Sequence, residues 1–88
     1  MKAYELLSDE SKWTKCGIAR DMYGNVCPAR STEAICWCAV GAVEKCYDDK
    51  EYSINIGRLY MESDGNIGRW NDSTTFEEVK AMLTKLDI

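Results

Sequence analysis

The stretch that most constrains this chain runs from Ser31 to Tyr47 and contains nine consecutive uncharged residues, Ile35 to Val43. Charged residues make up 30% of the whole chain, so this stretch stands out from its surroundings. On a helix it is apolar on nearly every side, and a helix of that kind is normally buried all round. We therefore predict a central core helix over residues 32–47, against which the other elements pack.

Apolar residues at helical spacing predict three further helices, over residues 2–8, 54–63 and 75–87. The last of these opens with Thr75, which Glu78 follows three residues later. This spacing is the capping-box pattern, in which each side chain satisfies a free amide of the other residue.

Asp21 and Gly24 occupy the first and fourth positions of a predicted type I turn. This turn indicates one β-hairpin over residues 17–27, and residues 67–72 are expected to form an irregular connector. A chain of 88 residues without a linker has room for a single domain, residues 1–88. The predicted fold class is a small, mostly helical α+β domain.

The formal net charge of −4 argues against a nucleic-acid partner, because such binding depends on lysine and arginine neutralising phosphates. No signal peptide is recognisable at Met1–Leu7. The longest apolar run is far shorter than the roughly 20 residues that cross a bilayer. We expect no membrane association and a cytoplasmic protein.

The five cysteines are an odd number, and the chain contains no histidine and no Cys-x-x-Cys pair. Structural zinc sites need four ligands, usually from such pairs. We therefore expect reduced thiols, no metal site and no cofactor.

Asp21, Cys38 and Asp72 are the candidates for catalysis, with the thiol as nucleophile and the carboxylates as acid and base. No histidine is present to activate Cys38, and mid-helix burial raises the pKa of a thiol. Both aspartates sit where turns need such side chains. Packing and turn formation account for the three residues better than catalysis does, so we expect that the protein is not an enzyme.

The aromatic residues exceed what one small core readily absorbs, and several of them stand in turns or connectors. Aromatic side chains beside an acidic rim are typical of a protein-binding surface. The expected protein-binding residues are Tyr23, Tyr52, Trp70, Asp48, Asp49 and Glu51.

Four short motifs occur in a fixed order along most of the chain: Trp13-Thr14-Lys15, Ala19-Arg20-Asp21-x-x-Gly24, Trp37-Cys38-Ala39-Val40-Gly41-Ala42, and Trp70-Asn71-Asp72 ahead of a helix that contains Val79. In these motifs the chain resembles a family of small, functionally uncharacterised bacterial and bacteriophage proteins. The resemblance implies no known reaction. It implies a bacterial or phage origin, a cytosolic setting, and one neighbourhood for Asp21, Cys38, Asn71 and Asp72. Cys16 departs from the pattern and is not expected to be functional.

These features lead us to expect a non-catalytic, phage- or prophage-derived protein that binds and inhibits a host protein. An inhibitor of bacterial defence of the anti-CRISPR kind is one form of this hypothesis. A small hydrolase or transferase using Asp21, Asp72 and Cys38 is one alternative. The other is a structural or ligand-binding module. The sequence does not show whether a ligand pocket lies near Trp70 and Asp72. The sequence indicates no oligomeric state.

Overall fold

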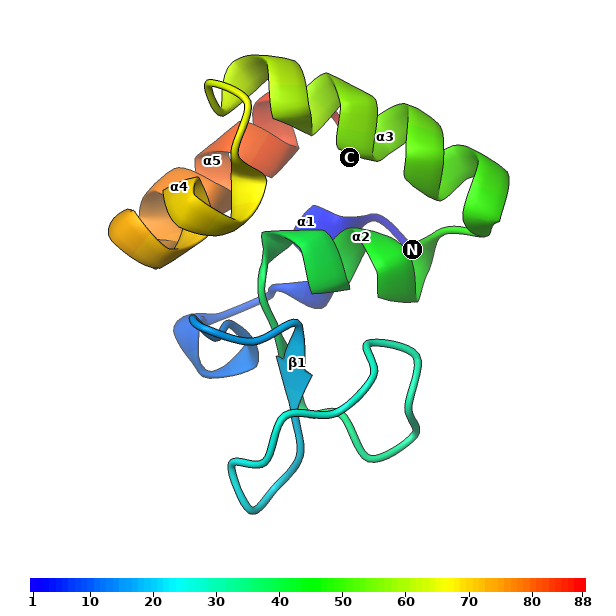
Figure 1. Ribbon diagram of the computed structural model, residues 1–88, viewed down its shortest axis with the longest axis vertical. Coiled ribbons are helices and arrows are strands. Elements are labelled where there is room, and N and C mark those ends of the chain that lie inside the picture. Colours follow the sequence, from blue (N-terminus) through cyan, green and yellow to red (C-terminus); the bar gives the residue numbers. More distant parts are fainter.

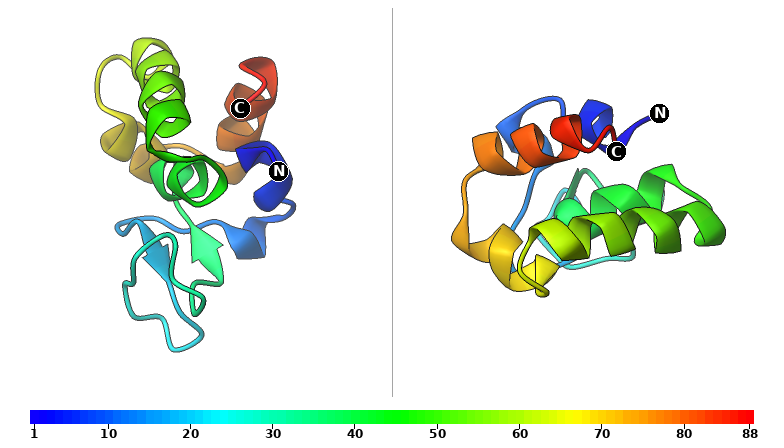
Figure 2. Two further views of the ribbon diagram at one scale, coloured as in Figure 1. Left: turned by 90° about the vertical axis from the view of Figure 1, so that its right-hand side faces the viewer. Right: turned by 90° about the horizontal axis from the view of Figure 1, so that it is seen from above.

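Helix α2, at Ala39–Cys46, lies in the middle of the structure, which is a computed structural model describing residues 1–88 (Figure 1). Helices α3, α4 and α5 form a layer on one side of α2, while the small sheet and two long loops lie on the other side (Figures 1 and 2). In chain order the elements are α1 at Ala3–Leu6, a 3-10 turn at Glu10–Lys12, β1 at Ala19–Arg20, β2 at Cys36–Trp37, α2, α3 at Asp49–Glu62, α4 at Ile67–Ser73 and α5 at Phe76–Lys85. The predicted α+β class is confirmed.

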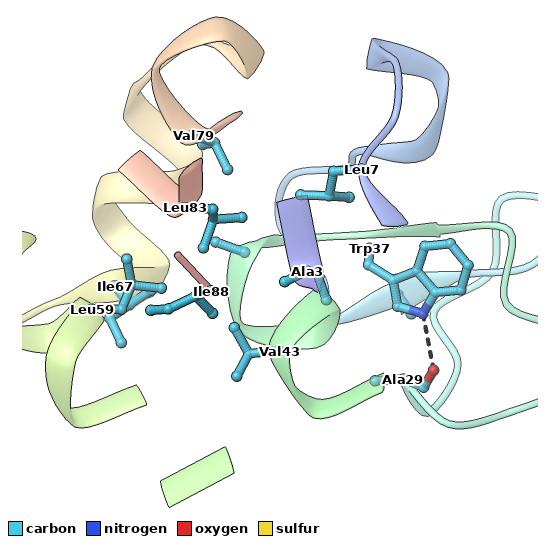
Figure 3. Close-up of a cluster of buried hydrophobic side chains, with 13 residues drawn as sticks. Ala3, Leu7, Ala29, Trp37, Val43, Leu59, Ile67, Val79, Leu83 and Ile88 are labelled. Atoms are coloured by element: carbon cyan, nitrogen blue, oxygen red, sulfur yellow. Dashed lines mark hydrogen bonds between the residues drawn. The ribbon is translucent and has the colours of Figure 1, made fainter. Parts of the chain in front are cut away.

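The hydrophobic core is built from small and branched side chains contributed by every layer, together with the indole of Trp37 (Figure 3). The largest fully buried apolar side chains are Leu7, Leu59, Leu83, Ile88, Val43 and Val79. The backbone oxygen of Ile88 accepts hydrogen bonds from the amide of Ala3 at 2.6 Å and from the hydroxyl of Tyr47 at 2.7 Å. The last residue therefore joins α1 to the end of α2.

The central helix begins at Ala39 and not at residue 32. Cys36 and Trp37 are extended and pair antiparallel with β1, Ala19 lying opposite Trp37 and Arg20 opposite Cys36. An apolar run of this length fits a buried strand as well as a buried helix, and periodicity alone does not separate them. Here pairing with a distant strand decides the conformation of the first half of the run.

The predicted turn at Asp21–Gly24 is present, but the strand that follows it is not the main partner of β1. One Asp21 carboxylate oxygen accepts from the amides of Tyr23 at 2.9 Å and Asn25 at 3.0 Å, and Gly24 has a φ of 81°. Past the turn, a single bridge joins Arg20 to Val26. The hairpin predicted within residues 17–27 is instead completed by β2.

The other helices are close to their predicted positions, with differences at their starts. Helix α3 begins at Asp49 and not near residue 54, because the Asp48 carboxylate caps it by accepting from the amide of Glu51. Residues predicted as an irregular connector form α4, which the Asn66 side chain caps. Helix α5 begins after Thr75, whose hydroxyl accepts from the amide of Glu78 as predicted.

Gly41 lets α2 approach the backbone just before β1. A Cβ atom at this position would lie 1.9 Å from the carbonyl oxygen of Ile18, which is far inside van der Waals contact. No side chain larger than hydrogen fits there.

None of the helices combines the length and the apolar character that a bilayer crossing requires.

Candidate functional site

The side chain of Asn71, on α4, is the centre of a buried hydrogen-bond network. Its oxygen accepts from the indole nitrogen of Trp13 at 2.7 Å and from the amide of Ala39 at 3.0 Å. Its nitrogen donates to the carbonyl of Thr14 at 3.2 Å and to the carboxylate of Asp72 at 3.1 Å. All four bonding positions of this amide are therefore used, which ties α4 to the start of α2 and to the segment before β1.

Asp72 extends the network to the loop that carries Cys16. Its carboxylate accepts from the amide of Cys16 at 2.9 Å, and this bond is the main reason that the pKa of Asp72 lies below its usual value. Cys16 has a φ of 58°, a left-handed conformation that this hydrogen bond helps to hold. Asp72 therefore acts as an acceptor for a strained backbone turn.

Arg20 clamps the same loop to the Asp21 turn. Its guanidinium donates to the hydroxyl of Thr14 at 3.2 Å, to the carbonyl of Cys16 at 3.1 Å and to the carbonyl of Gly24 at 2.9 Å. Five donors in a rigid fork suit arginine to joining several backbone oxygens in this way.

Cys38 is the N-cap of α2. Its sulfur accepts from the amide of Gly41 at 3.3 Å, and its own amide donates to the carbonyl of Ile18 at 3.2 Å. Burial is the main cause that raises the pKa of the Cys38 thiol, so the thiol stays protonated at neutral pH. The side chain is placed to start a helix, and no base activates it.

The structure brings Cys38, Asn71 and Asp72 together, as the resemblance implies, but it does not add Asp21 to the group. No hydrogen bond or ion pair joins Asp21 to any of the three, and its carboxylate serves the turn amides of Tyr23 and Asn25. Nor do any three cysteine, aspartate or glutamate side chains gather closely enough to hold a metal ion.

The most exposed aromatic side chain of the segment between β1 and β2 is that of Tyr23, in the turn that follows β1. Tyr23 is 79% exposed, and Met22 and Ile35 are exposed beside it. With Asp21, Thr32 and Glu33 these side chains line an open groove of about 380 Å³. We call this set of six residues the loop groove; it presents apolar side chains between two carboxylates.

Contacts at both ends hold the loop groove in place. Asp21 and Arg20 fix the first loop, while the indole nitrogen of Trp37 donates to the carbonyl of Ala29 at 2.9 Å in the second loop (Figure 3). Arg30 donates to the carbonyls of Glu44 and Tyr47 at the end of α2, where a cation is favourable. The tips project from a fixed base.

The residues predicted to bind a protein do not form one surface. Tyr23 lies in the loop groove, whereas Tyr52 is half-buried against the core and burial raises the pKa of its hydroxyl. Asp48 is used as a helix cap and Asp49 pairs with Arg30 at 3.1 Å, while Glu51 is exposed beside them. Tyr52, which was expected to bind a partner beside these acidic residues, therefore packs toward the core.

Trp70 packs partly on the core and borders a second, polar hollow of about 310 Å³. The other lining residues are Ser63, Asp64, Asn66, Arg69 and Ser73. Several of these polar groups already serve backbone atoms: Asn66 caps α4, and the hydroxyl of Ser73 donates to the carbonyl of Arg69.

Met22 and Ile35 are the surface residues that sequence reasoning missed. Met22 adjoins Tyr23 in the predicted turn, so a signal for it was present. Ile35 belongs to the apolar run, which predicted a buried helical position, and nothing local marks it as exposed.

Comparison of the chain with protein-family models, with curated proteins and with solved structures found no match.

Proposed function

We propose that this protein is a non-catalytic binding protein that attaches to another protein through the loop groove. The observation that carries the proposal is the joint exposure of Met22 and Tyr23, in the turn after β1, and of Ile35, which immediately precedes β2. Aromatic and methionine side chains are enriched at the centres of protein interfaces. These three side chains take no part in the protein's own core. Exposed apolar surface of this kind commonly marks a protein-binding site, so we propose that a partner covers it.

Preorganisation of the groove supports this role. Arg20, Trp37 and Arg30 hold the loop bases by side-chain hydrogen bonds, so binding orders only the tips. A binding surface that is already fixed loses less conformational entropy when the partner docks.

The charges around the groove indicate the partner's chemistry. Asp21 and Glu33 line it, and no lysine or arginine does. The whole chain is also acidic, with a net charge of −4. We propose a partner surface that combines an apolar patch with lysine or arginine, since complementary charges steer association and fix orientation.

The bonding of the catalytic candidates supports a role without chemistry. Asp21 binds turn amides, Asp72 binds the amide of Cys16, and Cys38 caps α2 with a raised pKa. A reactive cysteine needs the opposite, a lowered pKa and a nearby base.

The resemblance of the four motifs to those of small bacterial and bacteriophage proteins supports a phage or prophage origin and a place in the cytoplasm of a bacterial host. In that setting we propose that the bound protein is a host protein and that binding inhibits it. An anti-CRISPR-like inhibitor of a defence system is the concrete form that we favour.

Affinity capture from bacterial lysate tests the binding proposal, with the double variant Tyr23→Ser/Ile35→Ser as the probe. Wild-type protein should retain a partner that the double variant loses by about tenfold or more, because hot-spot truncation commonly costs over 1.4 kcal/mol. Tyr60→Ser, which removes another exposed tyrosine outside the loop groove, is the matched control and should retain the partner.

Plaque assays in strains with and without a defence system test the inhibitory step. Expression of the wild-type protein should raise plaquing on the defended strain, and the double variant should not. Equal capture by wild type and double variant would refute the loop groove as the binding surface.

A further inference from the structure

The outward face of α3 carries exposed apolar side chains that no other part of the chain covers. Ile54 is 56% exposed and Met61 is 80% exposed, while Leu59 on the opposite side of the helix is fully buried. Ile54 and Met61 are seven residues apart, about two helical turns, and so lie on one face. Figures 1 and 2 show α3 at the edge of the molecule, with the other elements on one side of it only.

Gly57 lies between these two residues on the same face, and nothing within the chain requires a glycine there. A Cβ atom at Gly57 would meet no atom within 4 Å, and the residue does not have a positive φ. At Gly41, by contrast, a Cβ atom would collide with the carbonyl of Ile18. A glycine in a helix interior costs up to about 1 kcal/mol relative to alanine, so the open position at Gly57 calls for a reason outside the chain.

A glycine flanked by apolar residues allows a second helix to approach closely, because the separation of packed helices depends on the side chains at the contact. The point midway between Ile54 and Met61 falls between Gly57 and Arg58. If two copies of α3 cross there in antiparallel directions, Ile54 of each copy meets Met61 of the other. The face is thus complementary to itself.

Charges at the two ends of this face favour the antiparallel arrangement. Lys50 precedes Ile54 by one turn, and Asp64 follows Met61 just beyond the helix end. The ion pairs of the chain, Lys2–Asp87, Arg30–Asp49 and Lys85–Glu62, leave both residues unpaired. An antiparallel pair sets Lys50 of each copy beside Asp64 of the other, whereas a parallel pair would oppose like charges.

We infer that α3 is a self-association surface, through which two copies of this chain form an antiparallel, two-fold dimer centred on Gly57. A two-fold contact uses the same patch on both copies, which fits a face that complements itself. One helix pair buries a small area, so the dimer belongs to the weak and reversible class. The inference is independent of the proposed function, because the loops that carry the loop-groove residues lie on the other side of α2 from α3 (Figure 1).

Sedimentation velocity of the full chain, from low micromolar to near-millimolar concentration, tests the inference. A reducing agent is present throughout, because the five cysteines are free and disulfide-linked dimers must be avoided. The weight-average mass should rise with concentration from that of one chain toward that of two, and the rise should shrink as salt screens the end charges.

Two variants test the contact itself. Met61→Ser and Gly57→Leu should each weaken association by about tenfold or more, since each change acts twice in a two-fold dimer. Thermal melts followed by circular dichroism check that both variants fold. Tyr23→Ser, in the loop groove, is the matched control and should associate like the wild type.

Gly57→Ala distinguishes a glycine needed for association from a glycine needed by the fold of the single chain. It should raise the melting temperature of the dilute monomer while it weakens association, because the added methyl group favours the helix but separates the two copies. A wild-type protein that stays monomeric throughout the concentration range would overturn the inference. Association that Met61→Ser and Gly57→Leu leave unchanged would overturn it equally, because the contact would then lie on another face.

Discussion

Replacement of Asn71 by alanine should cost the protein a large part of its stability. The amide oxygen is the acceptor for two donors, the indole of Trp13 and the amide of Ala39, and the residue is fully buried. Leaving a buried donor without a partner costs about 1–3 kcal/mol, and because the Trp13 donor is only partly buried, the two together amount to roughly 2–5 kcal/mol. A domain of this length has only about 4–13 kcal/mol in total.

Urea denaturation followed by tryptophan fluorescence measures this loss. With a slope near 1 kcal/mol/M for a small domain, the expected destabilisation lowers the midpoint by about 3 M or leaves the variant unfolded in water. Ser73→Ala, which removes an exposed hydroxyl from the same helix, is the control and should stay within about 0.5 kcal/mol of the wild type.

Asn71→Asp separates the roles of the two ends of the amide. It keeps an acceptor for Trp13 and Ala39 but sets a second carboxyl group against Asp72. Burial and the neighbouring charge raise the pKa of the introduced group, so its contribution is greatest at low pH and is lost as pH rises. The variant should approach the wild type in stability as the solution is acidified.

An Asn71→Ala loss below about 1 kcal/mol would refute the reasoning, because water would then be satisfying the two donors.

Three further results follow from the same contacts. Gly41→Ala should destabilise by about 3 kcal/mol or more in urea titrations, because the added methyl group meets the carbonyl of Ile18, and a near-neutral result would mean that α2 can shift. The lowered pKa of Asp72 adds stability that is complete above about pH 4 and is lost as pH falls through the folded-state pKa. Asp72→Asn should therefore make the free energy of unfolding fall less steeply as the solution is acidified. An unchanged acid dependence would assign the loss to other carboxyl groups. In native alkylation read by mass spectrometry, exposed Cys16 should react first and Cys38 last, because burial raises the pKa of the Cys38 thiol; early labelling of Cys38 would contradict its role as a helix cap.

Local patterns in the sequence predicted the elements that local chemistry determines. Thr75 marks the start of α5, and Asp21 with Gly24 marks the turn, because each side chain bonds to amides within four residues of itself. In both cases the physical cause lies within a few residues of the signal.

The parts that the sequence did not predict depend on distant partners. Cys36 and Trp37 are strand residues because β1 pairs with them, and no local feature distinguishes that outcome from a helix. Asn66 resembles a helix stop after Gly65, yet its side chain caps the helix that follows. The capping role of Asn66 becomes visible only once the next residues are known to be helical.

The candidate site was predictable in part. The resemblance placed Cys38, Asn71 and Asp72 together but wrongly added Asp21, while structural roles for Cys38 and Asp72 were expected from the residues themselves. The distant partners of these side chains became visible only in the structure.

The loop groove was not predicted, because it forms when Ile35 lies beside Met22 and Tyr23. These residues are more than ten positions apart in the sequence, and hydrophobic periodicity gives no information about contacts over such separations.

The clamps formed by Arg20 and Arg30 have a consequence for how such a protein can evolve. They fasten the two loops to the rest of the fold, and the exposed side chains of Met22, Tyr23 and Ile35 take no part in the hydrophobic core. Substitutions at these three positions are therefore close to neutral for stability, whereas Asn71 and Trp13, whose side chains bond to each other, have little freedom to vary. The contact residues of such a protein could therefore change rapidly in evolution, in response to changes in a binding partner, while the fold stays the same.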